Sequence, residues 1–360
     1  MKKYCHRFFG LILALAPLHA APAAELLYVP LVLDNLVLTY DISGLNAVAV
    51  KNSERTFISS NIFGPNGIAF DPAGNVYVSN GPSNSISKFD PTGNFLSTIG
   101  SSVMLSDPAG LAVDSQGNLY AANFGGYSGE SDALNNTVAK FDSAGTFVGA
   151  ISNNVNRPFG VLVDAADNLY VGNWFTNNIS KFDSSGTFQT ALGDSNNIDG
   201  PMGLGKDSGG NLFVANLNAP LGSNVTKFDP AGLFAGYIGE SANLTNPAAL
   251  AIDSAGNLYV SSGISNTAMI SKFDSLGALQ FSWTIPSAAN TMAIAVPEPS
   301  SIVLLLLGAG ALIALRVRIV RSDRATSVAG SASRGKGIRR AFPDTPSSKE
   351  PPRPYDTGMP

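Results

Sequence analysis

An internal repeat runs through most of the 360 residues and constrains the fold more than any other feature. One copy runs from Pro65 to Gly93 and reads PNGIAFDPAGNVYVSN, then NSISKFDPTG. The leading proline recurs at positions 108, 158, 201 and 247, so the copies start 43, 50, 43 and 46 residues apart. Units of this length, each with several short β-rich runs, are typical of four-stranded propeller blades.

Each copy contains two turn signals of the form Asp-x-x-Gly. Asp bonds its own backbone at the start of a turn, and Gly supplies the positive φ that closes a β-hairpin. The first signal occurs at 71–74, 114–117, 207–210 and 253–256, and Asp167 replaces the glycine in the third copy. The second signal occurs at 41–44, 90–93, 142–145, 183–186, 229–232 and 274–277, which is one copy more than the full repeats.

The extra turn indicates how the ring closes. Residues 26–29 and 35–41 match the second and third strands of a unit that lacks its first strand, and residues 291–295 match that missing strand. Pairing of the two ends completes a sixth blade and removes free sheet edges. The sequence therefore predicts an all-β, six-bladed β-propeller over residues 24–296, with four-stranded blades.

The repeat unit resembles the NHL repeat, whose pattern is close to P-x-G-I-A-V-D-x-x-G-N-L-Y-V-A-[DN] followed by N-x-I-x-x-F-D-x-x-G. The resemblance recurs in all five copies and implies the same propeller fold. WD-repeat and Kelch patterns do not fit, because the chain has only two tryptophans, Trp174 and Trp283, and neither ends a repeating Trp-Asp.

The first 23 residues have the three parts of a secretory signal. A basic start at residues 2–7 precedes an apolar core at 8–18 and small residues at 21–23. We expect residues 1–23 to be a signal peptide and the mature chain to begin at Ala24. A buried N-terminal helix is the alternative, and the prolines within this segment disfavour it.

Removal of this segment limits the chemistry of the mature chain. His6, His19 and Cys5, which are all the histidines and the only cysteine, would be lost with it. Catalysis by Ser-His-Asp or Cys-His groups and zinc sites built from His or Cys are then excluded. Residues 24–299 hold nine basic and 22 acidic residues, so nucleic acid is not an expected partner.

A second addressing segment lies near the C-terminus. Pro297, Glu298 and Pro299 precede an apolar run at 302–315, and four arginines follow: Arg316, Arg318, Arg321 and Arg324. Extended through Val320, the run of residues 302–320 is long enough to cross a membrane with the arginines on the cytoplasmic side. A plain C-terminal membrane anchor would have the same layout.

The order of these features in residues 297–324 resembles the PEP-CTERM sorting signal of Gram-negative bacteria. The resemblance implies an inner-membrane-anchored precursor that an exosortase, a membrane protease, cuts near Pro297. The product would be secreted or held at the cell surface, often with exopolysaccharide. The family usually ends soon after the arginines, whereas residues 325–360 continue here as a basic tail that we expect to be disordered.

Candidate binding residues follow the predicted second strands, where loops meet at the mouth of the central channel. Four of these strands end in asparagine, at Asn80, Asn123, Asn173 and Asn216. Four carboxamides near one axis could hold a hard cation such as Ca²⁺ or bind a sugar. The alternative is that each asparagine caps its own turn. No other cofactor is indicated.

An aromatic and cationic group falls on the same predicted face. Trp174 follows Asn173, and Arg157 and Phe159 flank the proline of the neighbouring first strand. These residues could stack on a sugar, whereas Trp174 could equally plug the channel. The Lys-Phe-Asp triplets that begin at Lys88, Lys140, Lys181, Lys227 and Lys272 recur in every copy, so we interpret them as structural, with Phe between blades and Lys paired with Asp.

Two functions are compatible with these features. The first is an extracellular or cell-surface binding or scaffold protein for polysaccharide or envelope components, with no catalytic residue assigned. The alternative is a Ca²⁺-dependent hydrolase similar to gluconolactonase and strictosidine-synthase propellers, but we find no glutamate on a first strand to complete such a site. Streptogramin-lyase-like propellers also resemble the repeat, yet their chemistry requires a histidine that the mature chain lacks.

Overall fold

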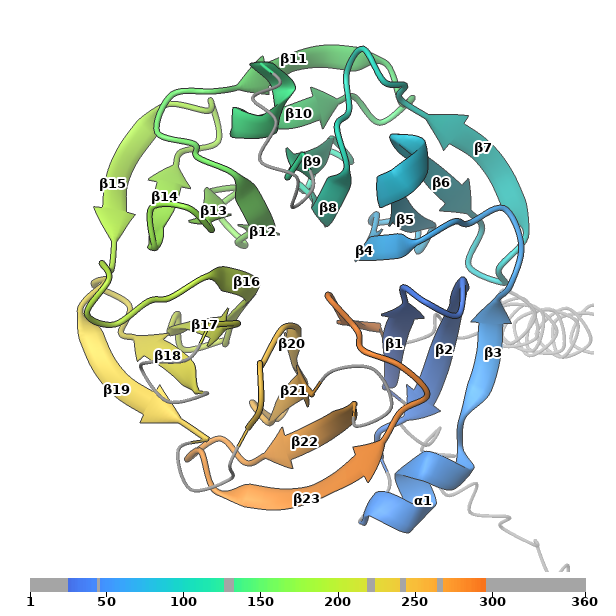
Figure 1. Cartoon of the computed structure of the whole chain (residues 1–360), viewed down its shortest axis with the longest axis vertical. Helices are drawn as coiled ribbons and strands as arrows, with labels where there is room; N and C mark the ends of the chain where they lie inside the picture. Colours follow the sequence, from blue (N-terminus) through green and yellow to red (C-terminus); the bar gives the residue numbers. More distant parts are fainter. Residues whose placement is uncertain are drawn as a thin grey trace, which may run out of the picture. The chain divides into compact units, whose positions relative to one another are not determined.

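The computed structural model describes residues 25–43, 46–125, 133–218, 224–239, 244–263 and 268–295. These residues lie in one compact unit, in which six four-stranded antiparallel sheets form a ring (Figure 1). The first strand of each sheet lies at the centre of the ring and the fourth at its rim. The predicted six-bladed all-β propeller is confirmed.

Five blades are built from consecutive sequence, and each begins at one of the repeat positions. The first is β4 (Pro65–Phe70), β5 (Val76–Asn80), β6 (Ser85–Phe89) and β7 (Phe95–Ile99); the second is β8 (Pro108–Val113), β9 (Leu119–Asn123), β10 (Thr137–Phe141) and β11 (Phe147–Ile151). The third is β12 (Pro158–Val163), β13 (Leu169–Asn173), β14 (Asn178–Phe182) and β15 (Phe188–Leu192); the fourth is β16 (Pro201–Lys206), β17 (Leu212–Asn216), β18 (Val225–Phe228) and β19 (Phe234–Ile238). The fifth is β20 (Leu250–Ile252), β21 (Leu258–Ser262), β22 (Met269–Phe273) and β23 (Leu279–Thr284).

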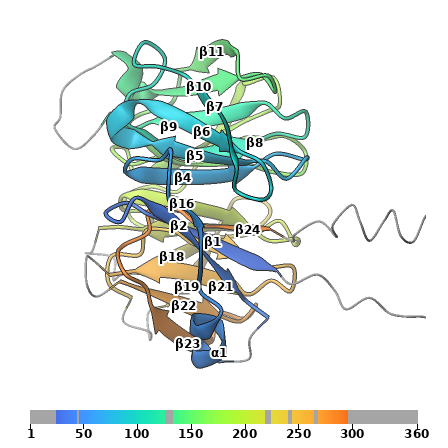
Figure 2. The same ribbon diagram turned by 90° about the vertical axis from the view of Figure 1, so that its right-hand side faces the viewer.

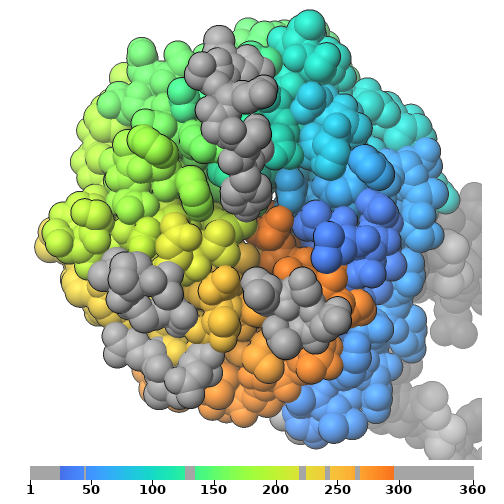
Figure 3. Space-filling view, viewed as in Figure 1, coloured from blue at the N-terminus to red at the C-terminus, as the bar shows by residue number. Residues whose placement is uncertain are grey.

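The sixth, closing blade joins the two ends of the domain, as the sequence predicts. Its strands are β24 (Ala293–Ala295), β1 (Leu26–Leu31), β2 (Leu36–Asp41) and β3 (Arg55–Ile58). Leu27 pairs with Ile294 in the antiparallel register of β1 and β24. Figures 2 and 3 show the orange C-terminal segment beside the blue N-terminal strands.

Short helical segments interrupt three hairpins. They are α1 (Ala47–Asn52), η1 (Gly81–Ser83) and η2 (Ala133–Asn136). After α1, Glu54 accepts hydrogen bonds from the Tyr40 hydroxyl (2.5 Å) and from Lys51, and the Tyr40 ring packs edge-on against Trp283 of β23. This insertion therefore fastens the closing blade to the fifth blade.

Four of the innermost strands, β4, β8, β12 and β16, approach the next blade so closely that glycine is required at their third position. A Cβ atom added to Gly160 would lie 2.0 Å from the carbonyl oxygen of Met202 in the next blade, and one added to Gly67 would lie 2.1 Å from that of Ala109. Gly110 and Gly203 have similar contacts, at 2.6 and 2.8 Å. The Pro-x-Gly start of the first four repeats therefore permits this close approach, whereas the fifth repeat has Ala249 at the third position.

The predicted Asp-x-x-Gly turns are confirmed by their hydrogen bonds. Asp71 Oδ1 accepts from the backbone N–H groups of Ala73 (3.0 Å) and Asn75 (2.9 Å), and the Gly74 N–H donates to the Asp71 carbonyl (2.9 Å). Gly74 has φ of 79°, and Asp167, which replaces it in the third blade, adopts φ of 59°. Asp tolerates this left-handed conformation better than most residues, which explains the exception.

Apolar clusters fill each junction between neighbouring blades, and the Phe of the Lys-Phe-Asp triplet belongs to them. Phe182, for example, is 1% exposed and packs with Tyr120 and Val161. The predicted pairing of Lys with Asp is found only at Lys88 among the described triplets, and its partner at 3.6 Å is Asp71 of the first turn, not the Asp of the triplet. Each triplet lysine lies over an aromatic ring of its own second strand, as Lys140 does over Tyr120 at 4.9 Å, and the negative ring face attracts the ammonium group.

The predicted signal peptide, sorting segment and tail lie outside the described residues. Within the part of the chain that the structure describes, no helix is long and apolar enough to span a membrane.

Replacing Gly160 by Ala should lower the free energy of unfolding by about 2–3 kcal/mol, because its Cβ would overlap a backbone oxygen that cannot move alone. Gly172→Ala is a matched control in the same blade, since its nearest contact would be an ordinary 3.4 Å. Urea unfolding of both variants measures the difference. Equal stabilities would contradict the proposed role of the close approach.

Candidate functional site

The mouth of the channel is formed by the residue that follows each leading proline. Phe159 and Met202, each 1% exposed, pack with Ala109, Ala248 and the post-strand Phe124 into one apolar cluster. At the closing junction the equivalent residues are polar, and Asn290 donates to Asn66 Oδ1 at 2.9 Å. Side chains from six blades therefore fill the mouth, and its apolar part comes from the second to fifth blades.

The structure brings together three residues that the sequence predicts for this face. The Arg157 guanidinium lies 5.1 Å from the Phe124 ring centroid and 5.6 Å from that of Trp174. Phe159 packs beneath them, edge-on against Phe124 at 5.1 Å. The buried Phe159 occupies the channel mouth, whereas Trp174 is half-buried above it, and the adjacent Phe175 is 66% exposed.

Backbone geometry holds Arg157 in this position. Its φ is +46°, a conformation that few residues adopt without support. The Arg157 N–H donates to Asn136 Oδ1 of the preceding blade (2.9 Å), and its carbonyl accepts from the Trp174 N–H (3.1 Å). These bonds hold the Arg157 backbone beside the aromatic rings.

The four strand-end asparagines are buried and hydrogen-bonded within their own blades. Asn173 Oδ1 accepts from the Asn156 N–H (2.9 Å), and its Nδ2 donates to the hydroxyl of Ser180 (2.9 Å). The same pattern recurs at the other three asparagines. Asn80 bonds to Phe63 and Ser87, Asn123 to Ser106 and Thr137, and Asn216 to Asp199 and Thr226. These bonds support the local-capping alternative and not a shared ring of ligands.

A second set of asparagines, which sequence reasoning missed, connects neighbouring blades. Asn84 Oδ1 accepts from the Asp107 N–H at 2.7 Å, and Asn177 Oδ1 accepts from the Gly200 N–H at 3.0 Å. Asn35 and Asn136 do the same for Gly64 and Arg157. Each acceptor lies in the hairpin between the second and third strands of a blade, and each donor directly precedes a leading proline. The recurrence of asparagine at this hairpin position is the sequence signal that could have predicted these bonds.

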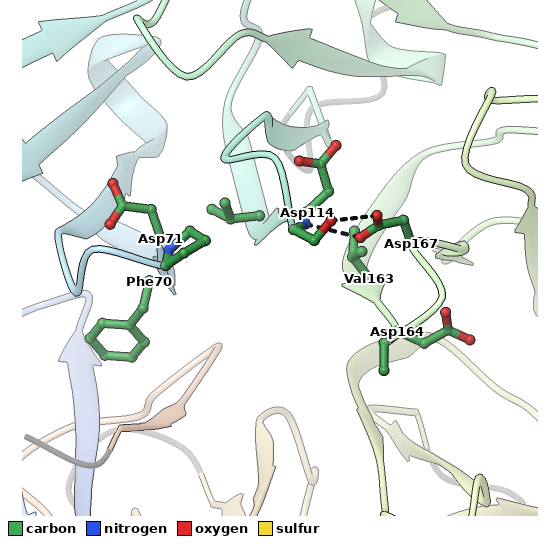
Figure 4. A pocket seen from close by; sticks show the side chains of 10 residues that line it. Phe70, Asp71, Asp114, Val163, Asp164 and Asp167 are labelled. Carbon is green, nitrogen blue, oxygen red and sulfur yellow. Dashed lines mark hydrogen bonds between the residues drawn. The ribbon is translucent and has the colours of Figure 1, made fainter. Parts of the chain in front are cut away.

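At the opposite end of the inner strands, three neighbouring turns surround a hollow of about 360 Å³. Figure 4 shows its four aspartates, with the Asp167 carboxylate directed at the Ser115 turn of the preceding blade. Asp71, Asp114 and Asp164 bond their own turns and the tyrosine six residues after each aspartate. In the described part of the chain, no group of three or more His, Cys, Asp or Glu residues could hold a metal ion.

Asp164 carries an ion pair between blades. Lys206 Nζ of the fourth blade lies 2.8 Å from Asp164 Oδ2 and 2.9 Å from the Tyr170 hydroxyl. Burial raises the pKa of Asp164, but hydrogen bonds from Lys206 and Asn168 outweigh it and lower that pKa to about 2. The folded state therefore favours the carboxylate.

This lowered pKa predicts a loss of stability in acid. The contribution of Asp164 is complete above the ordinary aspartate pKa of about 3.9 and declines as the pH falls towards 2. Asp164→Asn should therefore cost on the order of 1 kcal/mol at pH 7, with a difference from the parent that shrinks below pH 4. Thermal unfolding across this range measures it, with the exposed Asp34→Asn as control; a difference independent of pH would contradict the assignment.

Comparison with known proteins identifies the sorting segment and the fold. Residues 295–321 match the family model of the PEP-CTERM protein-sorting motif. This match confirms the predicted sorting signal at Pro297, Glu298 and Pro299 and extends to Arg316 and Arg318. No curated protein matches the sequence.

Solved propellers resemble the structure at low sequence identity. A chain of a nidogen–laminin complex aligns with a TM-score of 0.61 and 19% identity, over 76% of this chain and 99% of that one. Virginiamycin B lyase of Staphylococcus aureus aligns with a TM-score of 0.51 and 14% identity, over 70% and 78% of the two chains. A streptogramin B lyase gives 0.50 and 18%, over 62% and 70%. At these identities the likeness shows the fold alone.

Proposed function

We propose that this six-bladed propeller with a PEP-CTERM protein-sorting motif is exported and acts as a binding or scaffold protein outside the cell. Its precursor is anchored in the inner membrane of a Gram-negative bacterium through residues 302–320, and an exosortase-type membrane protease releases it. The product is secreted or held at the cell surface, where it binds polysaccharide or an envelope protein.

The position of the motif supports release of an intact domain. The matched segment begins at Ala295, which is also the last residue of β24. Cleavage beyond residue 296 would leave β24 paired with β1, so the ring stays closed and no sheet edge is exposed at that junction. The matched segment and the closing strand share only Ala295, so cleavage beyond residue 296 removes no part of β24.

The cluster of Arg157, Trp174 and Phe175 is the observation that carries the binding role. The guanidinium lies over two aromatic rings, and Phe175, which follows Trp174 in the chain, has 66% of its surface exposed. None of these residues is required by the repeat, because the other blades have different residues at the same positions. A rigid aromatic surface with a fixed cation suits stacking and hydrogen bonding to a sugar or to an envelope protein.

No described contact favours the Ca²⁺-dependent hydrolase over binding. The asparagines that would hold the ion use their oxygen atoms for backbone N–H groups and their nitrogen atoms for hydroxyl groups. A binding role therefore needs no metal ion at these asparagines, whereas the hydrolase needs one.

Replacing Phe175 by Ala should weaken retention of the protein on polysaccharide and protein fractions of its native envelope about tenfold, the equivalent of about 1.4 kcal/mol. Phe95→Ala is the matched control, since Phe95 is also an exposed aromatic residue, at 41%, but lies on the rim strand β7. Co-sedimentation with each fraction measures retention. Equal retention of both variants, or none by the parent protein, would contradict the proposed role.

A further inference from the structure

A groove lies where the rim strand of the second blade meets the third blade. It consists of two adjoining hollows, of about 790 and 250 Å³, which share Asn154 and Phe188. The larger hollow lies between β11 and the β14–β15 turn, and the smaller continues along β14 and β15 beneath residues 154–156. The larger is within the range of small-ligand pockets, and the pair forms an elongated space suited to a chain.

The groove is free of charged side chains. None of the residues that line the two hollows, all in the described part of the chain, is Asp, Glu, Lys or Arg. The surrounding domain is strongly acidic, with nine basic and 22 acidic residues in 24–299. An anionic ligand would be repelled by this field and a cationic one would find no partner in the groove, so the chemistry favours a neutral ligand.

Polar side chains along one edge of the groove are available to a ligand. In the described part of the chain, the side chains of Ser152, Asn153, Asn154 and Asn156 make no hydrogen bond. The backbone of this segment is nonetheless held, since the Asn154 carbonyl accepts from the Ser180 hydroxyl at 2.5 Å and the Asn156 N–H donates to Asn173. The loop is therefore fixed while its side chains remain free.

The corresponding loop of the next blade uses its polar side chains differently. There Asn197 Oδ1 accepts from the Asp194 N–H (3.0 Å), and Asp194 Oδ1 accepts from the Asn196 N–H (2.8 Å). The polar side chains of that loop stabilise its own turn. Residues 152–156 keep their loop without this help, so their amides stay available as both donors and acceptors.

Phe188 supplies an apolar surface between the two hollows. It is half-buried, is held edge-on against Phe182 at 5.9 Å, and lines both spaces. The C–H groups of a pyranose ring pack on such a face, while the hydroxyl groups at the ring's edge require partners that can donate and accept. An aromatic face beside several unpaired amides matches both needs.

We propose that this groove binds a neutral oligosaccharide chain, with one sugar stacked on Phe188 and its neighbours hydrogen-bonded by Asn153, Asn154 and Asn156. It is a second site, separate from Arg157 and Trp174. The inference adds a ligand class to the proposed binding role but uses other residues, so either site can fail without the other.

The test is titration of the full-length chain with a neutral oligohexose and with an oligouronate of equal length, followed by calorimetry. The neutral chain should bind and the acidic one should bind at least tenfold more weakly. Phe188→Ala and Asn153→Ala should each lower the affinity for the neutral chain about tenfold, equal to about 1.4 kcal/mol. Asn154→Gly should do the same while keeping the φ of 59° at that position.

Phe147→Ala is the matched control, because Phe147 holds the equivalent place on β11 but does not line the groove. It should bind like the parent, and unfolding curves of all variants separate loss of fold from loss of binding. The proposal is overturned if the neutral oligohexose does not bind, if the oligouronate binds as well, or if Phe147→Ala loses as much affinity as Phe188→Ala. If the groove proposal fails but Phe175→Ala still loses envelope retention, the proposed binding function is retained.

Discussion

The contact between glycine Cα atoms and carbonyl oxygen atoms around the central channel is the constraint on which the structure depends. At Gly160 no side chain fits, because the Met202 oxygen would lie 2.0 Å from a Cβ. The same contact recurs at three other junctions, and at the closing junction Thr291 donates its hydroxyl to the Asn66 carbonyl at 2.7 Å. The inner strands therefore fix one another's positions, and the residues beside them converge at the channel mouth.

Two sets of asparagines hold the loops and hairpins next to these inner strands. One set, represented by Asn173, ties the incoming loop to its own blade in four blades, and the other, represented by Asn177, ties a hairpin to the next blade at four junctions. Both sets use carboxamides because a single side chain must accept from a backbone N–H and, in the first set, also donate to a hydroxyl. Residues that repeat around the ring thus hold it together, and the departures from the repeat are where recognition is available.

Much of the fold was predictable from the sequence because it depends on short-range rules. The positive φ of Gly74 and the bonds of Asp71 follow from turn chemistry, and the pairing of β24 with β1 follows from counting turn signals. The closeness of Arg157, Phe159 and Trp174 also followed, because their place in the repeat puts them at one end of neighbouring strands.

Other features depend on where side chains of separate blades meet, which the repeat does not encode. Lys140 was expected to pair with an aspartate, but it lies over the Tyr120 ring of the adjacent strand. The four strand-end asparagines were a candidate cation site in the sequence, but their side chains hydrogen-bond to backbone N–H and hydroxyl groups of their own blades. The groove at Phe188 could not be foreseen, because it arises from the distance between β11 and the β14–β15 turn and from amides that the loop leaves unused.

A closed propeller should be released intact from its sorting signal. The most direct test is the intact mass of the protein that the native host releases. A chain that begins at Ala24 and ends just beyond residue 296 is predicted, since it lacks the signal peptide and the arginines but keeps β24 in the closing blade. A mass that retains Arg316 and the residues after it, or an end before Ala293 that removes β24, would contradict the account.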